Sequence, residues 1–278
     1  MNVPIMTHNL ALQIERSKGD YLESWVQGMR EYPGNPFGAD MVWMNNVRVL
    51  AASHLQEVGL FNTVIGLGSQ DKELLPDIVR FYHDNGIEHY HLEINPYQVT
   101  SEFLAALAVN GFSLSAFQTY IYGVPALNPP MHPFSDITVH DVTPSELDLF
   151  ADLHVEGFQE ALSRLPESTR MLYRESVKVL YQLSGWHLYL VRINMTSSGM
   201  GMLYIQNGLA FLGGGATLPH MRMKGGQTAS LRHRLIVAAQ AQCSLFSGQT
   251  RVGSRSQHNM KRIGMQIAYN GTFWKRYS

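Results

Sequence analysis

A proline-rich segment near the middle of the chain, GVPALNPPMHPFS at residues 123–135, most constrains how this sequence can fold. Its four prolines are Pro125, Pro129, Pro130 and Pro133. Proline has no amide hydrogen to donate and restricts the residue before it, so the segment cannot form a helix interior or a central strand. We therefore predict that it joins two folded parts of the 278-residue chain, giving a domain at 1–124, a linker at 125–135 and a domain at 136–278.

The part before the linker alternates helical and strand patterns. Apolar residues recur at helical spacing over 73–83 and 101–110. Short apolar runs at 57–68, 87–94 and 117–122 are typical of strands. The order strand, helix, strand, helix, strand predicts a layered domain of the α/β or α+β class, in which helices pack on a sheet.

The part after the linker begins with a strand pattern at 137–142 and a strong helix-start signal. Thr143, Pro144 and Glu146 supply a hydroxyl cap, a proline at the first helical position and a glutamate three residues after the cap. Helices are expected near 143–162, 167–183, 226–243 and 257–263. Strands are expected near 187–193, 201–206, 209–217 and 245–248, with a strand pair around 265–274.

Charged residues are distributed unevenly along the chain. All 22 Asp and Glu lie in residues 1–175, whereas residues 176–278 hold 12 of the 21 Lys and Arg. The net charge is therefore −13 before residue 176 and +12 from there on. This asymmetry suggests an anionic partner for the C-terminal part. It also excludes acid–base catalysis by a carboxylate pair within residues 176–278.

Several classes of protein are excluded by what the sequence lacks. The N-terminus shows no basic stretch followed by an apolar run, so no secretory signal is expected. No stretch approaches the roughly 18 consecutive apolar residues that a membrane helix needs. Cys243 is the only cysteine, which rules out an internal disulfide and a thiolate metal cluster. We expect a cytoplasmic protein without a metal, because His89 and His91 share a strand face but lack a third ligand at suitable spacing.

The segment LAFLGGGATLPHMRMKGGQTASLRHRLIVAA, residues 209–239, is where we expect the chemistry. A strand ends near ATLP, a loop with Arg222, Lys224 and two glycines follows, and a helix begins near Gln227. The first amide groups of a helix lack acceptors within the helix, and the helix dipole adds positive potential there. Glycines let the backbone approach an anion closely. The sequence therefore predicts a site for a phosphate or pyrophosphate.

Two motifs in this half resemble those of the GNAT (GCN5-related N-acetyltransferase) superfamily. RMKGGQTA at 222–229 resembles the acyl-CoA loop Arg/Gln-x-x-Gly-x-Gly/Ala, with Gln227 in place of the usual small residue. GSRSQHNMKRIGM at 253–265 is similar to the Ser-x-x-Asn-x-x-x-x-Gly-Phe segment late in that fold, with Met265 in place of phenylalanine. The order of predicted elements matches the family from about residue 137 onward.

The resemblance implies an α/β (α+β) protein with two GNAT-like domains, each a mixed, mostly antiparallel sheet flanked by helices. The first domain resembles a degenerate copy. Residues 86–123 keep the order strand, helix, Gly-Phe, strand, with Gly111 and Phe112 in place, but the Arg-x-x-Gly loop is missing. The second domain is then the acyl-CoA-binding catalytic domain.

The resemblance also implies where the cosubstrate, acetyl-CoA, is held. Its pyrophosphate is expected on the loop amides, and its pantetheine arm beside the preceding strand end, where backbone N–H groups polarise the thioester carbonyl. Gly213, Gly214 and Gly215 are expected to permit a bulge or a close approach in that strand. The implied cofactor-binding residues are Ala216, Thr217, Leu218, Arg222, Met223, Lys224, Gly225, Gly226, Gln227, Thr228 and Asn259.

Departures from the family pattern leave the catalytic groups open. Many members use a tyrosine four residues before the Gly of Gly-Phe as the acid that protonates the leaving thiolate, and this position is Met260 here. Ser256 and Asn259 are candidates to orient a water or the thiol. Because no Asp or Glu follows Glu175, a catalytic carboxylate has to come from earlier in the chain. The candidate bases are Glu156, Glu160, His154 and an ordered water.

Together these features predict an acyl-CoA-dependent N-acyltransferase that moves acetyl from acetyl-CoA to a primary amine of a small molecule, by direct attack in a ternary complex. One alternative is a non-catalytic acyl-CoA sensor or interaction module, which Met260 and the missing base favour. Nucleic-acid binding is disfavoured, because the basic residues form no dense run and no aromatic-interleaved stripe. We expect no membrane partner, and a monomer or a homodimer.

Overall fold

The computed structural model describes residues 3–129 and 136–276, and the chain divides into two compact units. The N-terminal unit consists of Met6–Tyr120 and Ala268–Ser278, and the C-terminal unit of Met1–Ile5 and Ile121–Ile267. The division after Tyr120 lies close to the domain boundary expected at residue 124, but the end of the chain belongs to the first unit. Of the predicted linker, residues 124–129 form no helix or strand, and 130–135, with Pro130 and Pro133, lie outside the described residues.

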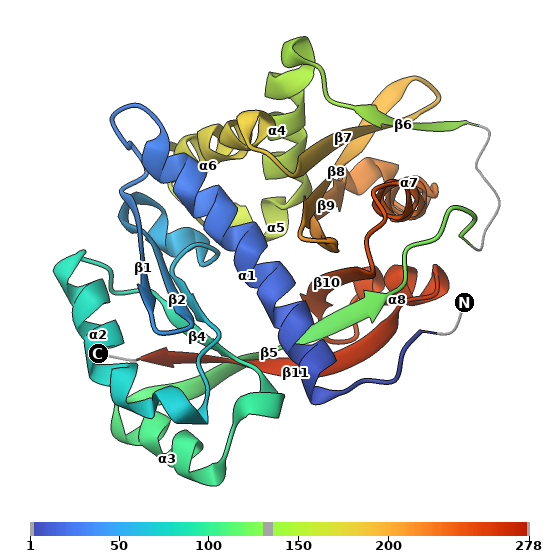
Figure 1. Cartoon of the computed structure of the whole chain (residues 1–278). Coiled ribbons are helices and arrows are strands. Elements are labelled where there is room, and N and C mark those ends of the chain that lie inside the picture. The colour runs from blue at the N-terminus through green and yellow to red at the C-terminus, as the bar shows by residue number, and fades with distance from the viewer. Residues whose placement is uncertain (1–2, 130–135, 277–278) are drawn as a thin grey trace. The chain divides into compact units, whose positions relative to one another are not determined.

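The N-terminal unit is a mixed sheet with helices packed on it (Figure 1). Its strands follow the order β1-β2-β3-β4-β11-β5, and the β3–β4 pair is parallel. The predicted helices are confirmed as α2 and α3, whereas α1, β1 and β2 were not predicted and β3 is shorter than expected. The elements are α1 (His8–Glu31), β1 (Ala39–Met44), β2 (Val47–Ala52), β3 (Thr63–Ile65), α2 (Leu75–Asp84), β4 (His91–Ile94), α3 (Ser101–Val109), β5 (Phe112–Gly123) and β11 (Gln266–Arg276).

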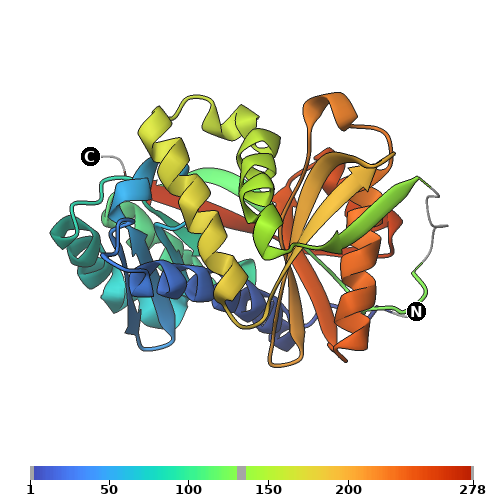
Figure 2. The same cartoon turned by 90° about the horizontal axis from the view of Figure 1, so that it is seen from above.

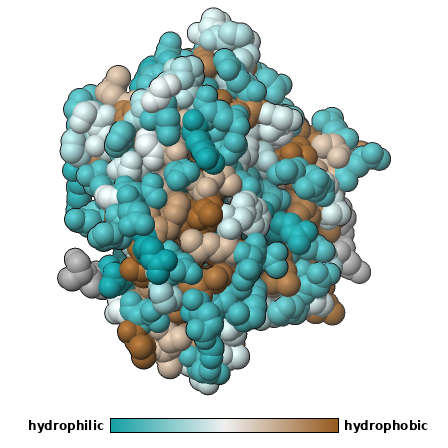
Figure 3. Space-filling model, turned by 60° about the vertical axis from the view of Figure 1, so that its left-hand side comes forward, coloured by the Kyte–Doolittle hydropathy of each residue, from teal (hydrophilic) through white to brown (hydrophobic). Residues whose placement is uncertain are grey.

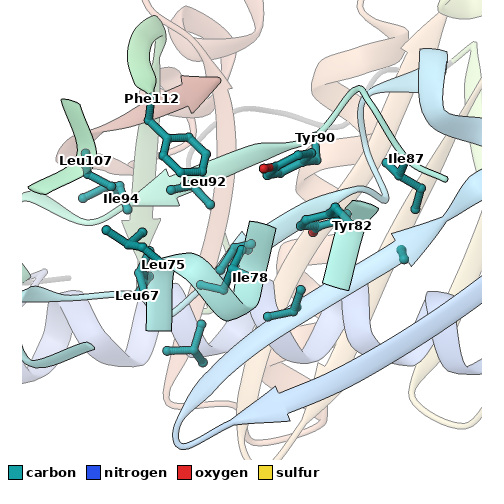
Figure 4. Packing of buried hydrophobic residues seen from close by; sticks show 14 of the residues in the cluster. Leu67, Leu75, Ile78, Tyr82, Ile87, Tyr90, Leu92, Ile94, Leu107 and Phe112 are labelled. Atoms are coloured by element: carbon teal, nitrogen blue, oxygen red, sulfur yellow. The ribbon is translucent and has the colours of Figure 1, made fainter. Parts of the chain in front are cut away.

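Helix α2 packs on the core of this unit through one apolar face (Figure 4). Leu75, Ile78 and Tyr82 recur at the three- and four-residue spacing that places side chains on one side of a helix, and all three are buried. The ring of Tyr82 stacks on that of Tyr90, with centroids 3.9 Å apart. Its hydroxyl donates to the backbone carbonyl of Leu50 at 2.8 Å, so the buried polar group is satisfied.

The strand pair predicted around 265–274 is wrong, because the structure has the single strand β11 there. Asn-Gly is typical of a tight hairpin turn, yet Asn270-Gly271 lies in the middle of this strand. A Cβ at Gly271 would come within 3.0 Å of the Tyr120 ring, so glycine makes room for the aromatic side chain. Strand β11 pairs antiparallel with β4, and Thr272 of β11 lies opposite Ile94 of β4.

The C-terminal unit carries a sheet of order β10-β9-β8-β7-β6, in which only the β9–β10 pair is parallel. The predicted strands and helices are confirmed to within a few residues, except that the first helix is interrupted at Phe158. The elements are β6 (Ile137–Asp141), α4 (Leu147–Gly157), α5 (Gln159–Leu162), α6 (Glu167–Val179), β7 (Trp186–Ile193), β8 (Thr196–Gln206), β9 (Leu209–Thr217), α7 (Gly226–Gln240), β10 (Leu245–Arg251) and α8 (Arg255–Arg262).

The predicted helix-start signal is confirmed. Glu146 accepts from the backbone N–H of Thr143 at 3.1 Å, which closes a capping box. Pro144 begins a short 3₁₀ turn, η4 (Pro144–Glu146), that leads into α4. The backbone hydrogen bond from Thr143, with His140 as a further partner, lowers the pKa of Glu146 to about 2.

Helices α4 and α7 cover opposite faces of this sheet (Figure 2). A Cβ at Gly214 would point toward His154 of α4, and a Cβ at the next residue, Gly215, toward Arg234 of α7. Adjacent residues of a strand point to opposite faces, so the two helices sandwich β9. The end of β9 is therefore reachable by residues of both layers.

The surface view in Figure 3 is covered mainly by hydrophilic residues, with hydrophobic ones in smaller patches. Within the described residues, no helix combines the length and apolar character needed to cross a membrane.

Candidate functional site

Strand β9 carries a bulge at its glycines. Gly215 lies opposite Gly201 of β8, but Leu212 lies opposite Leu203, so Gly213 and Gly214 together face one residue of β8. Of the bulge or close approach expected at the three consecutive glycines, the structure has the bulge. An extra residue in one strand bends that strand and interrupts the ladder locally.

Beyond the bulge, β9 parts from β10. The parallel pairing joins Leu209–Leu212 to Leu245–Gly248, whereas β9 continues to Thr217 and β10 to Arg251. The β10-facing edge of residues 213–217 therefore has backbone N–H and C=O groups that no described strand pairs. Such groups need a partner, which an extended ligand can supply.

Helix α4 closes one face of this opening. A Cβ at Gly157 would overlap that of Ala216, so the helix end approaches the strand backbone closely. His154, one turn earlier, is buried, and its Nε2 lies 2.8 Å from the Tyr173 hydroxyl. Burial lowers the pKa of His154 to about 3, which leaves a neutral imidazole that is a poor base at neutral pH.

The loop after β9 turns sharply before α7 begins. Following the short 3₁₀ turn η6 (Pro219–Met221), Met223 and Gly225 adopt positive φ values of 67° and 88°. Gly225 is the residue that caps α7, and no side chain of the described residues accepts from the first amides of the helix. The first turn also contains no acidic residue. These amides therefore form an uncapped helix start with positive potential.

A cavity of about 1160 Å³ joins this helix start to the end of β9. Arg222, Lys224, Arg255 and Arg262 bring positive charge to its wall, and no Asp or Glu is among the described residues that line it. All predicted cofactor-binding residues line the cavity except Leu218. This residue is buried, and its backbone N–H donates to the backbone carbonyl of Ser198.

The predicted cofactor-binding residues include Asn259 of α8 but not three other residues of this helix that line the cavity. Arg255, His258 and Arg262 line it at positions three and four residues apart, which places them on one helix face. A basic stripe at this spacing was readable in the sequence. Whether this basic face of α8 points toward the loop depends on how the helix packs, and the sequence pattern alone does not specify that.

Gln227, Ser256 and Asn259 are brought together behind the loop. The Gln227 side-chain nitrogen donates to the Ser256 hydroxyl at 3.3 Å. The Gln227 side-chain oxygen accepts from the Asn259 side-chain nitrogen at 2.6 Å. Asn259 and Ser256, predicted as catalytic candidates, therefore hold the side chain that departs from the family motif. Gln227 links the start of α7 to α8, which a glycine or alanine there could not do.

The two carboxylates among the candidate bases lie in different places. Glu160 lines a second cavity, of about 380 Å³, together with Gly213, Gly215 and Met260. Its carboxylate lies 3.0 Å from an Arg222 guanidinium nitrogen, and its side chain is 81% exposed. Glu156 lines a separate cavity of about 530 Å³. The structure therefore brings Glu160, but not Glu156, to the opening at β9.

Among the described residues, no group of three or more His, Cys, Asp or Glu side chains could hold a metal ion. His91, considered as a ligand with His89, is buried and stacks on Phe273 with ring centroids 4.4 Å apart. Burial lowers the pKa of His91 to about 3. The histidine is thus part of the N-terminal packing.

Three solved structures of similar fold cover most of the chain. A GCN5-related N-acetyltransferase from Kribbella flavida aligns over 93% of this chain and 95% of its own, with TM-score 0.64 and 12% identity. One from Sphaerobacter thermophilus aligns over 82% and 79%, with TM-score 0.56 and 13% identity. A tandem GNAT protein from the clavulanic acid biosynthesis pathway aligns over 92% and 94%, with TM-score 0.57 and 13% identity. No protein-family model and no curated protein sequence matches the chain.

These alignments define the class of fold. The chain is a mixed α/β protein with mostly antiparallel sheets flanked by helices. Its fold is that of the GCN5-related N-acetyltransferases, and the alignment with a tandem GNAT protein extends over both units. The fold predicted from the two motifs is confirmed.

Proposed function

We propose that the protein is an acyl-CoA-dependent N-acyltransferase of the GNAT superfamily that acts on a primary amine of a small molecule. The observation that carries the proposal is the cavity of about 1160 Å³, which joins the uncapped start of α7 to the open edge of β9. It combines a site for phosphates with a strand edge for an extended arm. Neighbours of the same fold that are named N-acetyltransferases support the reaction class.

The residues present fit coenzyme A. The amides of residues 226–228 would hold its pyrophosphate, because within the described part of the chain no side chain caps them and the first turn holds no acid. Arg255 and Arg262 would add charge for the remaining phosphate. The open edge of residues 213–217 would pair with the pantetheine arm. When bound, the thioester supplies an activated acyl group.

The chain would then contribute positioning and backbone hydrogen bonds. N–H groups at the open edge of β9 can donate to a carbonyl oxygen on which negative charge develops. Glu160 is the carboxylate that lines the opening, so we assign it the role of the base that accepts the proton of the attacking amine. Its ion pair with Arg222 links this carboxylate to the loop that precedes α7.

Three other predicted residues receive different roles in this proposal. Ser256 and Asn259 position Gln227 and, through it, the loop. Glu156 lines the neighbouring cavity of about 530 Å³, where Asp152 and Glu167 pair with Arg174 and Arg170, so Glu156 is the acid that would contact an acceptor amine there. The catalytic domain is thus proposed to comprise residues 136–267, with the first unit as a degenerate copy.

The test is calorimetric titration of the whole chain with coenzyme A and acetyl-CoA, followed by thiol release over a panel of small amines. We expect one binding site per chain and thiol release that depends on the amine. Absence of coenzyme A binding would contradict the proposal. Light scattering of the same samples decides between the expected monomer and homodimer.

A second candidate, a non-catalytic acyl-CoA sensor, is favoured by one specific observation. Met260, which stands at the position of the family's tyrosine acid, lines the opening and cannot donate a proton. In this alternative, acetyl-CoA binds and no amine of the panel releases the thiol. Tight binding with measurable turnover would contradict it.

A further inference from the structure

Arg234 is a buried arginine that the proposed function does not use. It lies in the third turn of α7 and is 2% exposed. Its Nε donates to the carbonyl of Ser230 at 3.2 Å and its Nη1 to the carbonyl of Met202 at 3.0 Å. The described residues place no acceptor on Nη2 and no carboxylate beside the guanidinium. An arginine buried without a counter-ion is rare, because an unpaired buried charge is costly.

The guanidinium occupies a groove made by two glycines. Tyr189, Gly201 and Gly215 lie opposite one another on β7, β8 and β9. A Cβ at Gly201 would meet the Arg234 Nε and Cζ at 3.2 Å, and one at Gly215 would meet Nη2 at 3.0 Å. The side chain therefore runs across the strands under two missing side chains. Its tip lies under β9, the last strand before the opening to β10.

Part of this arrangement has a structural explanation. The bulge places Met202 opposite two residues of β9, which disturbs the local hydrogen-bond ladder, and Nη1 satisfies the Met202 carbonyl. A neutral amide could make the same hydrogen bond. The positive charge, and the Nη2 that points under Gly215, are left without a structural partner.

Arg234 lines the cavity of about 380 Å³ at this opening, and so does Gly215, under which Arg234 Nη2 lies. Phe158 and Ala161 line it from the α4 side, and Leu231 and Met260 from the α7 and α8 side. Since the two helical layers lie on opposite faces of the sheet, the cavity passes between β9 and β10. A group that enters along the open edge of β9 therefore ends near a buried positive charge.

We propose that the acyl group transferred by this protein carries a terminal carboxylate, as in the short dicarboxylic acyl-CoA thioesters, and that Arg234 Nη2 binds it. The inference rests on the proposed acyl-CoA site. A carboxylate supplies the missing counter-ion and two acceptor oxygens, whereas an acetyl methyl leaves the charge unpaired. Burial lowers the pKa of Arg234 only to about 10, so the guanidinium stays charged at neutral pH.

The test compares the affinities of succinyl-CoA, acetyl-CoA and coenzyme A for the full-length protein by calorimetry, without an acceptor. We expect succinyl-CoA to bind at least about tenfold more tightly than acetyl-CoA. The carboxylate that binds Arg234 could belong to the acyl group or to the acceptor molecule. Because the titration contains no acceptor, it tests the acyl group alone. Equal affinities for the two thioesters would overturn the inference while the proposed function stands. Failure of all three to bind would overturn both.

Variants locate the preference. Arg234→Gln keeps a donor for the Met202 carbonyl but removes the charge. The variant should therefore bind succinyl-CoA and acetyl-CoA with about equal affinity, and its affinity for coenzyme A should be unchanged. Arg234→Lys should retain part of the preference. Arg232→Gln makes the same change on the same helix but away from both cavities, and should change nothing. A preference that persists in Arg234→Gln, or is lost equally in Arg232→Gln, would overturn the assignment.

Discussion

Each unit of the molecule contains a parallel strand pair joined by a helical crossover, and the two crossovers begin differently. In the C-terminal unit, Gly225 precedes α7, and Thr228 occupies the third helical position. In the N-terminal unit, Gly68 precedes η2 (Ser69–Leu74), which leads into α2, and Asp71 occupies the third position. The Asp71 carboxylate accepts from the Gly68 backbone N–H at 3.1 Å. One helix start is open, and the other is closed by its own side chain.

The difference explains why we propose an anion site at one crossover and none at the other. A carboxylate in the first turn satisfies an amide and neutralises the positive end of the helix. The basic residue beside it, Lys72, is also paired, with Glu102. Around α7, by contrast, four basic residues line the cavity with no acid among the described lining residues, and of these four Arg222 pairs with the exposed Glu160. The first unit therefore has a helical crossover without the charge pattern on which the proposed coenzyme A site depends.

The largest expected effect comes from moving the acid into the open helix start. Thr228→Asp places a carboxylate at the third position of α7, where it repels the pyrophosphate and competes for the amides. We expect coenzyme A affinity to fall by about 1000-fold, or about 4 kcal/mol, in calorimetric titrations. The melting temperature should not fall, because an acid in the first turn suits the helix dipole.

Thr228→Asn is the matched control, because asparagine has nearly the shape of aspartate without its charge. It should retain affinity within about fivefold of the wild type. If the two variants lose affinity equally, the effect is steric, and the comparison between the two helix starts does not explain binding.

A smaller effect, on stability, separates the interiors of the two units. Glu15 on α1 is buried and accepts from Gln98 at 2.6 Å. Burial raises its pKa from 4.5 to about 8, so the folded unit holds a proton that the unfolded chain releases above pH 4.5. Stability is therefore lost as pH rises from about 5 toward 8, at up to about 1.4 kcal/mol per pH unit.

Glu15→Gln keeps the acceptor oxygen and removes the titration. Urea unfolding at pH 5.5, 7 and 8.5 should show the variant gaining about 2–3 kcal/mol relative to wild type across this range. A difference between the two proteins that is constant with pH would contradict the assignment. The neighbouring buried pair of Lys18 and Glu93 is present in both proteins, and the charges of both residues act on Glu15.

The smallest effect reverses the first experiment. Asp71→Asn weakens the cap in the N-terminal unit and should lower the free energy of unfolding by about 1 kcal/mol. We expect no second coenzyme A site, because uncovered amides alone lack the basic wall found at α7. A calorimetric stoichiometry of two would show that the acid alone separates the two crossovers.

Much of the C-terminal unit could be predicted because its signals are local. The capping box at Thr143, the glycine run in β9 and the loop before α7 each depend on residues adjacent in sequence. Helix α2 could be predicted for the same reason, because Leu75, Ile78 and Tyr82 lie close together in the sequence. Where a side chain and its role lie within a few residues, the pattern is sufficient.

What the sequence did not predict depends on long-range packing. Helix α1 is a 24-residue helix that buries polar residues such as Glu15 and Lys18, which an amphipathic pattern places on the outside. Arg234 has the sequence context of a surface arginine, and two glycines far from it in sequence make its burial possible. Similarly, Asn270-Gly271 has the pattern of a turn until Tyr120 is placed against it.

The place of β11 has a consequence for synthesis on the ribosome. This strand lies between β4 and β5 of the N-terminal unit, yet its residues 268–276 are translated after the whole of the C-terminal unit. The nascent first unit therefore has a gap in its sheet, with two unpaired strand edges, while the remainder is made. Such edges are templates for wrong pairing. The first unit to be translated is the last that can complete its fold.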